Sequence, residues 1–225
     1  MKKLSILTMI LCFAVAAFAQ NKGTRSLKSF DRISVGESVS VTLVKGSSEK
    51  AEIEVSGADV DDVETKVSDG KLTVGMASGS YRNVKVRAII TYVSLEKVSV
   101  SSSASVKSDD TIKSSRFEAS ASSSGYMSLS LDVDRLEVSA NSSGTVKLAG
   151  NADEIKARVN SSGDIRAYDL RTRDADVSAN SSGRAEINVS DSLDARANSS
   201  GKVVYKGSPG KVNASANSSG KVQKA

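Results

Sequence analysis

The tetrapeptide Asn-Ser-Ser-Gly occurs five times, at Asn141–Gly144, Asn160–Gly163, Asn180–Gly183, Asn198–Gly201 and Asn217–Gly220. A copy with Ser in place of Asn precedes the set at Ser122–Gly125, and a more divergent copy lies at Ser101–Ala104. The final glycines stand at positions 125, 144, 163, 183, 201 and 220, so the steps between them are nearly equal. A regular period of about 20 residues is the mark of a solenoid repeat.

Each tetrapeptide is flanked by residues that alternate between apolar and polar. The run Leu136-Glu-Val138-Ser-Ala140 precedes the first of the five copies, and Val146-Lys-Leu148 follows it. Alternation with a period of two indicates a strand with one buried face and one exposed face. Each unit therefore reads as strand, tight turn, strand and looser turn, and stacked units bury apolar faces that one unit cannot bury alone. The sequence predicts an all-β fold, a β-solenoid (β-helix) of two-stranded rungs with a period of about 19 residues.

The residues of the tetrapeptide are typical of a tight turn. Glycine adopts positive φ at no steric cost, and Asn and Ser side chains bond to nearby backbone, so we expect glycine to hold the left-handed position. Stacking should place successive Asn side chains about 4.8 Å apart, which allows a ladder of amide hydrogen bonds. The predicted turn ladder comprises Asn141, Gly144, Asn160, Gly163, Asn180, Gly183, Asn198, Gly201, Asn217 and Gly220. The inward residues before the turns are small and predict a core that narrows at this edge; they are Ala140, Val159, Ala179, Ala197 and Ala216.

Residues 20–96 lack the repeat but keep strand patterns, as in Phe30–Val35 and Val39–Leu43. Residues Ala58–Ser68 place valines at helical spacing and form either one short helix or an irregular crossing. We interpret residues 20–96 as longer, irregular first rungs and residues 97–225 as the regular repeat. A separate N-terminal domain is the alternative, although no Pro- or Gly-rich linker marks a boundary near residue 95.

Residues 1–19 have the pattern of a secretory signal peptide. Lys2 and Lys3 precede the apolar run Leu4–Ala17, and Ala17-Phe-Ala19 is a small-x-small cleavage site. A membrane anchor is the less favoured alternative, because the apolar run is shorter than the roughly 20 residues that span a bilayer. Leu11 before Cys12 does not fit a lipid-attachment signal. We predict an exported protein located in the periplasm, at the outer-membrane surface or outside the cell, with no transmembrane segment in the mature chain.

The serine-rich glycine turns, the signal peptide and the stretch Tyr205-Lys-Gly207-Ser-Pro209 resemble the head GIN domain family of Bacteroidetes. That family is also called a putative auto-transporter adhesin and a domain of unknown function. The usual family repeat is Gly-Ser-Gly-like, whereas this chain has Asn-Ser-Ser-Gly. The resemblance covers the chain from about Phe30 to Val222. It implies a β-solenoid similar to pectin-lyase-like folds, without catalytic residues.

The composition excludes several kinds of active site. The sequence has no histidine, and its single cysteine lies in the predicted signal peptide. Ser-His-Asp and Cys-His catalysis and histidine-based zinc sites are therefore excluded. The repeat serines have no base beside them, and the acidic column Glu137, Asp176 and Asp194 is interrupted by Lys156. We predict a protein that is not an enzyme and has no metal site and no cofactor.

The charge distribution suggests a binding surface. Acidic residues predominate between Glu49 and Asp69, whereas no acidic residue follows Asp194. Arg184, Lys202 and Lys221 each follow a repeat glycine, so we expect them to stack in one column. One interpretation is contact with an anionic glycan, with Tyr126 as an exposed ring, and the other is protection of the terminal strand edge by lysine. Nucleic acid is not an expected partner, because the chain is exported and has few aromatic residues.

Two triplets, Asp110-Thr-Ile112 and Asp191-Ser-Leu193, resemble acceptors for O-glycosylation in exported Bacteroidetes proteins, with Thr111 and Ser192 as acceptors. The predicted function is a non-catalytic, adhesin-like or cell-envelope interaction module whose partner is a glycan or a surface protein. One alternative is a polysaccharide-binding or degenerate pectin-lyase-like protein. Another is a structural envelope component without a ligand. A homo-oligomer is also open, because solenoid ends expose strand edges.

Overall fold

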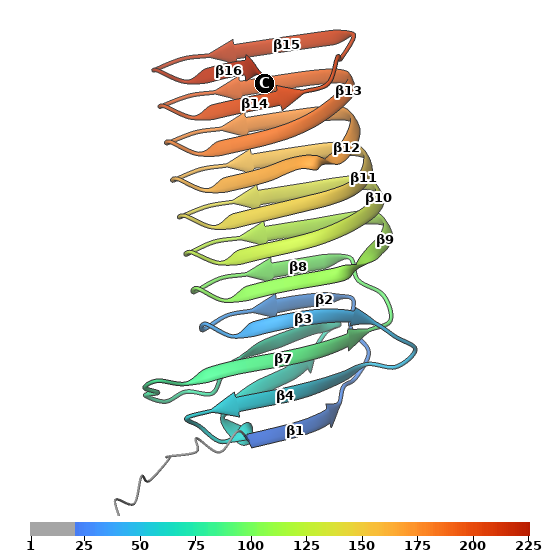
Figure 1. Cartoon of the computed structure of the whole chain (residues 1–225), viewed down its shortest axis with the longest axis vertical. Helices are drawn as coiled ribbons and strands as arrows, with labels where there is room; N and C mark the ends of the chain where they lie inside the picture. The colour runs from blue at the N-terminus through green and yellow to red at the C-terminus, as the bar shows by residue number, and fades with distance from the viewer. Residues whose placement is uncertain (1–20) are drawn as a thin grey trace, which may run out of the picture.

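The computed structural model describes residues 21–225, apart from the side chain of Asp109. The predicted signal peptide, residues 1–19, lies outside the described residues. Within them, the strands join into one sheet that winds into a β-solenoid with rungs roughly 19 residues apart (Figure 1). The predicted fold class is confirmed. Within residues 21–225, no helix has the length and apolar character needed to cross a membrane.

The elements of the described range are sixteen strands and one 3-10 helix. They are β1 (Asn21–Ser26), β2 (Arg32–Val35), β3 (Ser40–Lys45), β4 (Lys50–Ser56), η1 (Val60–Asp62), β5 (Val63–Ser68), β6 (Lys71–Met76), β7 (Lys85–Tyr92), β8 (Lys97–Val100), β9 (Ser105–Ala121), β10 (Tyr126–Ala140), β11 (Thr145–Val159), β12 (Asp164–Ala179), β13 (Arg184–Ala197), β14 (Lys202–Lys206), β15 (Lys211–Ala216) and β16 (Lys221–Lys224).

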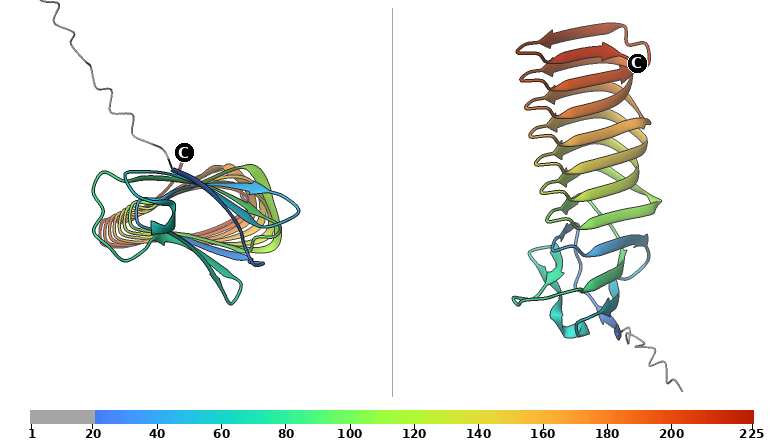
Figure 2. Two further views of the ribbon diagram at one scale, coloured as in Figure 1. Left: turned by 90° about the horizontal axis from the view of Figure 1, so that it is seen from below. Right: turned by 60° about the vertical axis from the view of Figure 1, so that its left-hand side comes forward.

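Each regular rung is one long, bent strand. β10 begins after a tight turn, runs along one face, bends and returns along the opposite face to the next tight turn (Figures 1 and 2). We call the segments after each tight turn the post-turn face and the segments before it the pre-turn face. The tight turns form the turn edge, and the bends form the bend edge. The looser turn predicted from the sequence is wrong in form, because the strand continues through the bend.

The bend edge absorbs the small differences in rung length. Between β11 and β12, Lys147 pairs with Arg166, but further along Ala149 pairs with Asp169, so one extra residue enters there. Near the turn edge, the next pairing of β12 with β13 starts in register at Asp164 and Arg184. The tight turns therefore stay aligned although the repeat glycines are not evenly spaced along the chain.

The core runs through the whole stack as one cluster of buried apolar side chains from Phe30 to Val203. Large side chains such as Leu136 and Leu148 lie away from the turns, and small ones such as Ala140 lie beside them, all at most 1% exposed. The alternation read from the sequence explains this arrangement, because every second residue of a strand points inward. Ala216 has the predicted inward position, in register with the buried Ala197, but it is exposed because no further rung covers it within residues 21–225.

The N-terminal residues extend the same stack. β2 and β3 form a rung that pairs with β8 and β9 on one side and with β6 and β7 on the other. β5, β4 and β1 then close this end with antiparallel pairing. Of the possible helix in Ala58–Ser68, only η1 forms, because the alternating residues of Val63–Ser68 pair as a strand with β6.

The two ends of the solenoid differ. At the N-terminal end, Arg25 lies across the base and donates hydrogen bonds to the carbonyl oxygens of Val60 (2.7 Å) and Val63 (2.6 Å). At the C-terminal end, all of β15 is exposed, and Val212 retains 46% of its accessible surface. Within residues 21–225, the last rung therefore leaves its inward side chains and its outer strand edges uncovered.

Candidate functional site

The turn edge is a continuous hydrogen-bonded ladder. Within one turn, the N–H of Gly163 donates to the carbonyl of Asn160 at 2.9 Å. Between turns, the N–H of Ser143 donates to the carbonyl of Ser161 at 3.1 Å, and the same bond recurs from turn to turn. Repetition of one turn geometry thus gives a straight, rigid edge whose serine side chains face solvent.

The two serines, and not the glycine, hold the left-handed backbone of each turn. Ser161 and Ser162 have φ values of 48° and 61°, and the serine pairs of the other repeats match them. The expectation that glycine supplies positive φ is therefore wrong. A Cβ on Gly163 would lie 2.3 Å from the carbonyl oxygen of Ala140 in the preceding rung. Glycine is needed because the neighbouring backbone passes too close for any side chain.

A further turn of this kind lies at Gly36–Val39, where Glu37 and Ser38 have φ values of 57° and 61°. The N–H of Ser38 donates to the carbonyl of Ser102, which joins this turn to the ladder. The sequence reasoning missed it because it has neither Asn nor the final glycine. The signal available was its place between the strand patterns of Phe30–Val35 and Val39–Leu43.

The asparagine side chains meet in the last rungs. Asn217 donates to Asn198 at 3.2 Å, and Asn198 donates to Asn180 at 3.1 Å. Asn180 donates to the hydroxyl of Ser178, so the described chain of amide bonds stops there. Each bond between asparagines links adjacent rungs and supports the stacking of the turns.

The three residues of the predicted basic column do stack, and a neighbouring acid balances the first of them. Strand pairing aligns Arg184 with Lys202, and Lys202 with Lys221. Arg184 forms an ion pair with Glu186, and this hydrogen bond raises the pKa of Arg184. Tyr126 lies three strands from Arg184 along the same column, so the structure does not bring it together with the other predicted contacts.

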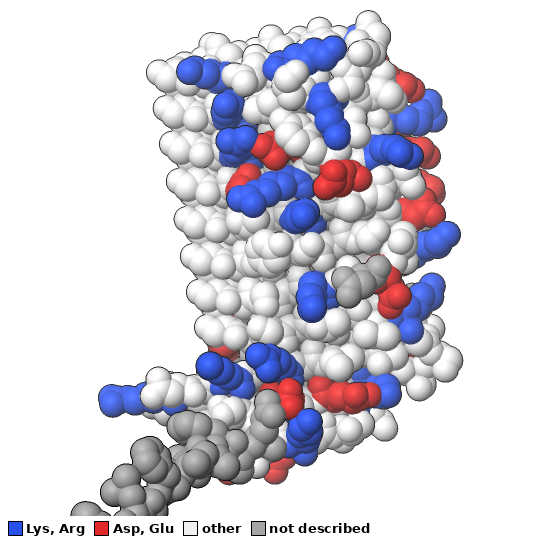
Figure 3. Space-filling view, in the orientation of Figure 1, with Lys and Arg blue, Asp and Glu red and all other residues white. Residues whose placement is uncertain are grey.

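The post-turn face carries a net positive charge, whereas the pre-turn face is balanced. From β8 to β16, the two outward columns of the post-turn face contain six basic and two acidic side chains: Lys107, Lys147, Arg166, Arg184, Lys202 and Lys221, with Asp164 and Glu186. The matching columns of the pre-turn face contain four of each sign: Lys97, Lys156, Arg158 and Arg196, with Glu118, Glu137, Asp176 and Asp194. Figure 3 shows the post-turn face, with its uncharged turn edge at the left.

The two acids of the post-turn columns pair with arginines, so the positive charges of the lysines there are not balanced by them. Asp164 pairs with Arg166 at 2.7 Å, and Glu186 pairs with Arg184. Among the described side chains, no ion pair involves the remaining cations of these columns, which are Lys107, Lys147, Lys202 and Lys221. This face can therefore attract a polyanion along much of the solenoid.

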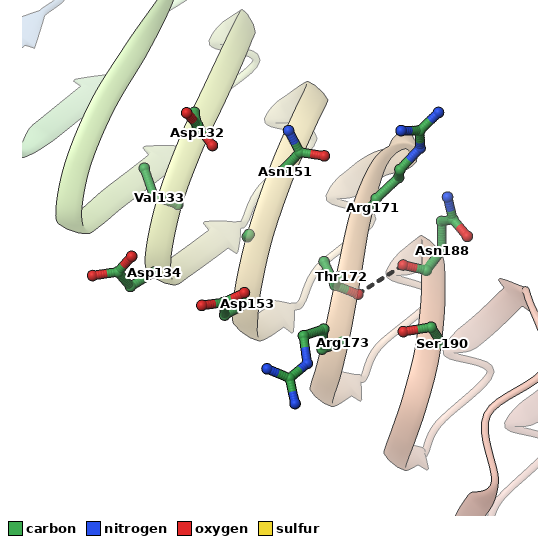
Figure 4. Close-up of a pocket in the computed structure, with 11 residues that line it drawn as sticks. Asp132, Val133, Asp134, Asn151, Asp153, Arg171, Thr172, Arg173, Asn188 and Ser190 are labelled. Atoms are coloured by element: carbon green, nitrogen blue, oxygen red, sulfur yellow. Dashed lines mark hydrogen bonds between the residues drawn. The ribbon is translucent and has the colours of Figure 1, made fainter.

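The bend edge holds a hollow of about 590 Å³ with carboxylates and guanidinium groups (Figure 4). Asp134 and Asp153 project from neighbouring bends, and Arg173 on the next bend pairs with Asp191 at 3.1 Å. Hydrogen bonds from Ser190 and Arg173 lower the pKa of Asp191. Within the described residues, no group of three acidic residues could hold a metal ion. The mixture of signs is that of a solvated, ion-paired edge.

The two predicted O-glycosylation residues differ in access. Thr111 is exposed at the bend edge, where its hydroxyl bonds to that of Ser130 at 3.2 Å. Ser192 is half-buried and donates a hydrogen bond to Asp174. Of the two residues, Thr111 is the more exposed to solvent.

A family model described as "Putative auto-transporter adhesin, head GIN domain" matches residues 29–209. The chain belongs to this family. The resemblance read from the turns is thereby confirmed. No curated protein matches this head GIN domain chain.

Solved structures share the solenoid. A putative adhesin from Bacteroides fragilis NCTC 9343 is 21% identical, with a TM-score of 0.82 over 91% of this chain and 96% of that chain. A putative adhesin from Parabacteroides merdae ATCC 43184 is 22% identical, with a TM-score of 0.73 over 92% of this chain and 100% of that chain. A putative lipid binding protein from Parabacteroides distasonis ATCC 8503 is 23% identical, with a TM-score of 0.68 over 91% and 97%. At these identities, the similarity shows the fold.

Proposed function

We propose that this head GIN domain chain is an exported, non-catalytic, adhesin-like module that binds an acidic glycan through its post-turn face. The observation that carries the proposal is the net charge of +4 in the two outward columns of that face, against balanced columns on the pre-turn face. Lys202 and Lys221 lie on neighbouring strands, about 4.8 Å apart, and Lys107 and Lys147 lie two strands apart, so a linear polyanion can follow these charges along the solenoid. The rigid turn edge holds this spacing fixed.

The test is binding of the purified protein to a glycan array that includes acidic polysaccharides and mucin-type sugars, at low and high salt. We expect binding to acidic glycans that weakens as salt rises, because screening reduces attraction between exposed charges. The variant Lys202→Ser/Lys221→Ser should weaken binding. The control Lys156→Ser/Arg158→Ser removes the same charge from the pre-turn face and should not.

Equal losses from both variants would show that only overall charge matters. Absence of binding on the array would contradict the proposal and leave a protein partner or a structural role in the envelope. In that outcome, the terminal lysines would serve to protect the open strand edge.

A further inference from the structure

Tyr126 is the one large aromatic side chain of the described residues that is strongly exposed, with 42% of its surface accessible. It projects from the post-turn face at the start of β10. Strand pairing sets Ser105 on one side of it and Thr145 on the other. The ring therefore stands in a row of small hydroxyl side chains and has no bulky neighbour across either strand.

Two lysines flank this ring at symmetric positions. Ser128, two residues after Tyr126, pairs with Lys107 of β9 and with Lys147 of β11. Both lysines are thus diagonal neighbours of Tyr126, at roughly 7–8 Å, a distance that long side chains can bridge. They lie two strands apart, so about 10 Å separates them. Both are exposed, and neither forms an ion pair with a described side chain.

We propose that Tyr126, Lys107 and Lys147 form a binding site for a linear acidic glycan that lies across the strands, along the solenoid axis. The C–H face of one sugar ring packs on Tyr126, and a carboxylate on either side of that ring reaches one lysine. The hydroxyls of Ser105, Ser128 and Thr145 are placed to bond to sugar hydroxyls. This inference rests on the proposed function and names the part of the face that recognises the sugar.

The surroundings favour a glycan over other polyanions or a lipid. A single ring among hydroxyl groups is not the row of stacking platforms that single-stranded nucleic acid uses. An acyl chain needs a continuous apolar surface, whereas the neighbours of Tyr126 on both strands are polar. By contrast, the column Lys202 and Lys221 has charge but no exposed ring beside it among the described residues.

The test is calorimetric titration of the purified protein with an oligogalacturonate and with its methyl-esterified form, which keeps the backbone but loses the charges. We expect the acidic form to bind and the ester to bind at least tenfold more weakly. Lys107→Ser/Lys147→Ser should weaken binding of the acidic form about tenfold, the effect of losing about 1.4 kcal/mol. Tyr126→Ser should weaken it about fivefold, while Tyr126→Phe should retain affinity because the ring remains.

The matched control is Lys156→Ser/Arg158→Ser, which removes the same charge from the pre-turn face. For a short oligomer, we expect it to change affinity less than twofold. Because the chain has no tryptophan, Tyr126→Trp adds a single tryptophan, which can be excited apart from the tyrosines and whose emission should change on binding. All the substituted side chains point outward, so we expect each variant to have the unfolding temperature of the unchanged protein. An unchanged temperature would exclude misfolding as the cause of weaker binding.

Two results would overturn the site while leaving the proposed function standing. One is acidic-glycan binding that Lys107→Ser/Lys147→Ser leaves intact while Lys202→Ser/Lys221→Ser weakens it. The other is acidic-glycan binding without any emission change at Tyr126→Trp. Absence of binding to acidic glycans altogether would contradict both the site and the function.

Discussion

The close approach of successive turns makes Gly163→Ala a sharp test of the solenoid. A Cβ there would meet the carbonyl oxygen of Ala140 at 2.3 Å and its carbon at 2.5 Å, both shorter than real contacts of this kind. That oxygen also accepts the N–H of Asn160 at 3.0 Å. The backbone must therefore move apart and strain the bond that joins two rungs.

The expected cost combines two terms. Overpacking a tight site costs about 1–3 kcal/mol, and losing a hydrogen bond costs about 0.5–1.5 kcal/mol. We expect Gly163→Ala to lower the free energy of unfolding by about 2–4 kcal/mol, a large part of the roughly 5–15 kcal/mol typical of a domain. The assay is guanidinium denaturation followed by circular dichroism, read as a change in midpoint at constant slope. The control is Gly210→Ala, where the added Cβ would have its nearest neighbour at 3.9 Å. We expect this substitution to change the free energy of unfolding by less than about 0.5 kcal/mol.

Gly163→Asn distinguishes two reasons for glycine: a positive φ at this residue, or the close approach of the neighbouring backbone. If glycine were needed for positive φ, asparagine would be the mildest replacement, because it tolerates the left-handed region. If the neighbouring backbone is the obstacle, asparagine should be at least as costly as alanine. Stability of Gly163→Ala within about 0.5 kcal/mol of the unchanged protein would refute the argument from close approach.

Three further outcomes follow from the turns and the charged face. Ser162→Gly should stabilise the protein by about 1 kcal/mol, because Ser162 has φ of 61° and glycine is the preferred residue there; unchanged denaturation would contradict this. Asn198→Ala should cost about 1–2 kcal/mol in the same assay by removing two amide bonds, whereas Asn151→Ala at the exposed bend edge should cost little. Arg184→Ser/Glu186→Gln removes a balanced ion pair and should weaken acidic-glycan binding less than Lys202→Ser, which removes one net positive charge; the reverse order in titration would count against the face-charge argument.

The repeating part of the fold can be predicted from the sequence, because the alternating pattern of each rung agrees with the way the rungs stack. Alternation around Ala140 and a tight turn that recurs at nearly equal steps are enough to set strands, turns and stacking. The turn geometry itself was misassigned, since a glycine can be required either by its own φ or by a neighbouring backbone. Only the stacked structure separates these two reasons.

The grouping of charged side chains on the post-turn face and the closing of the N-terminal end cannot be predicted from local sequence patterns. β12 holds an extra residue between Arg166 and Asp169, opposite Lys147 and Ala149 of β11, so counting residues misplaces side chains there. Grouping Lys107 with Tyr126 depends on pairing between strands, and each residue alone looks like an ordinary surface position. The closing of the N-terminal end by Arg25 depends on contacts 35 and 38 residues away, which no local pattern encodes.

The uncovered last rung has a consequence for how such proteins change in evolution. β15 presents the same inward side-chain spacing and free strand edge that β13 offers to it. A duplicated repeat inserted between two regular rungs would find the same template on both sides, while the closed N-terminal end would need no alteration. Each such unit would add about 4.8 Å to the reach of the post-turn face. Rung number is therefore a property that gene duplication can tune independently of the rest of the fold.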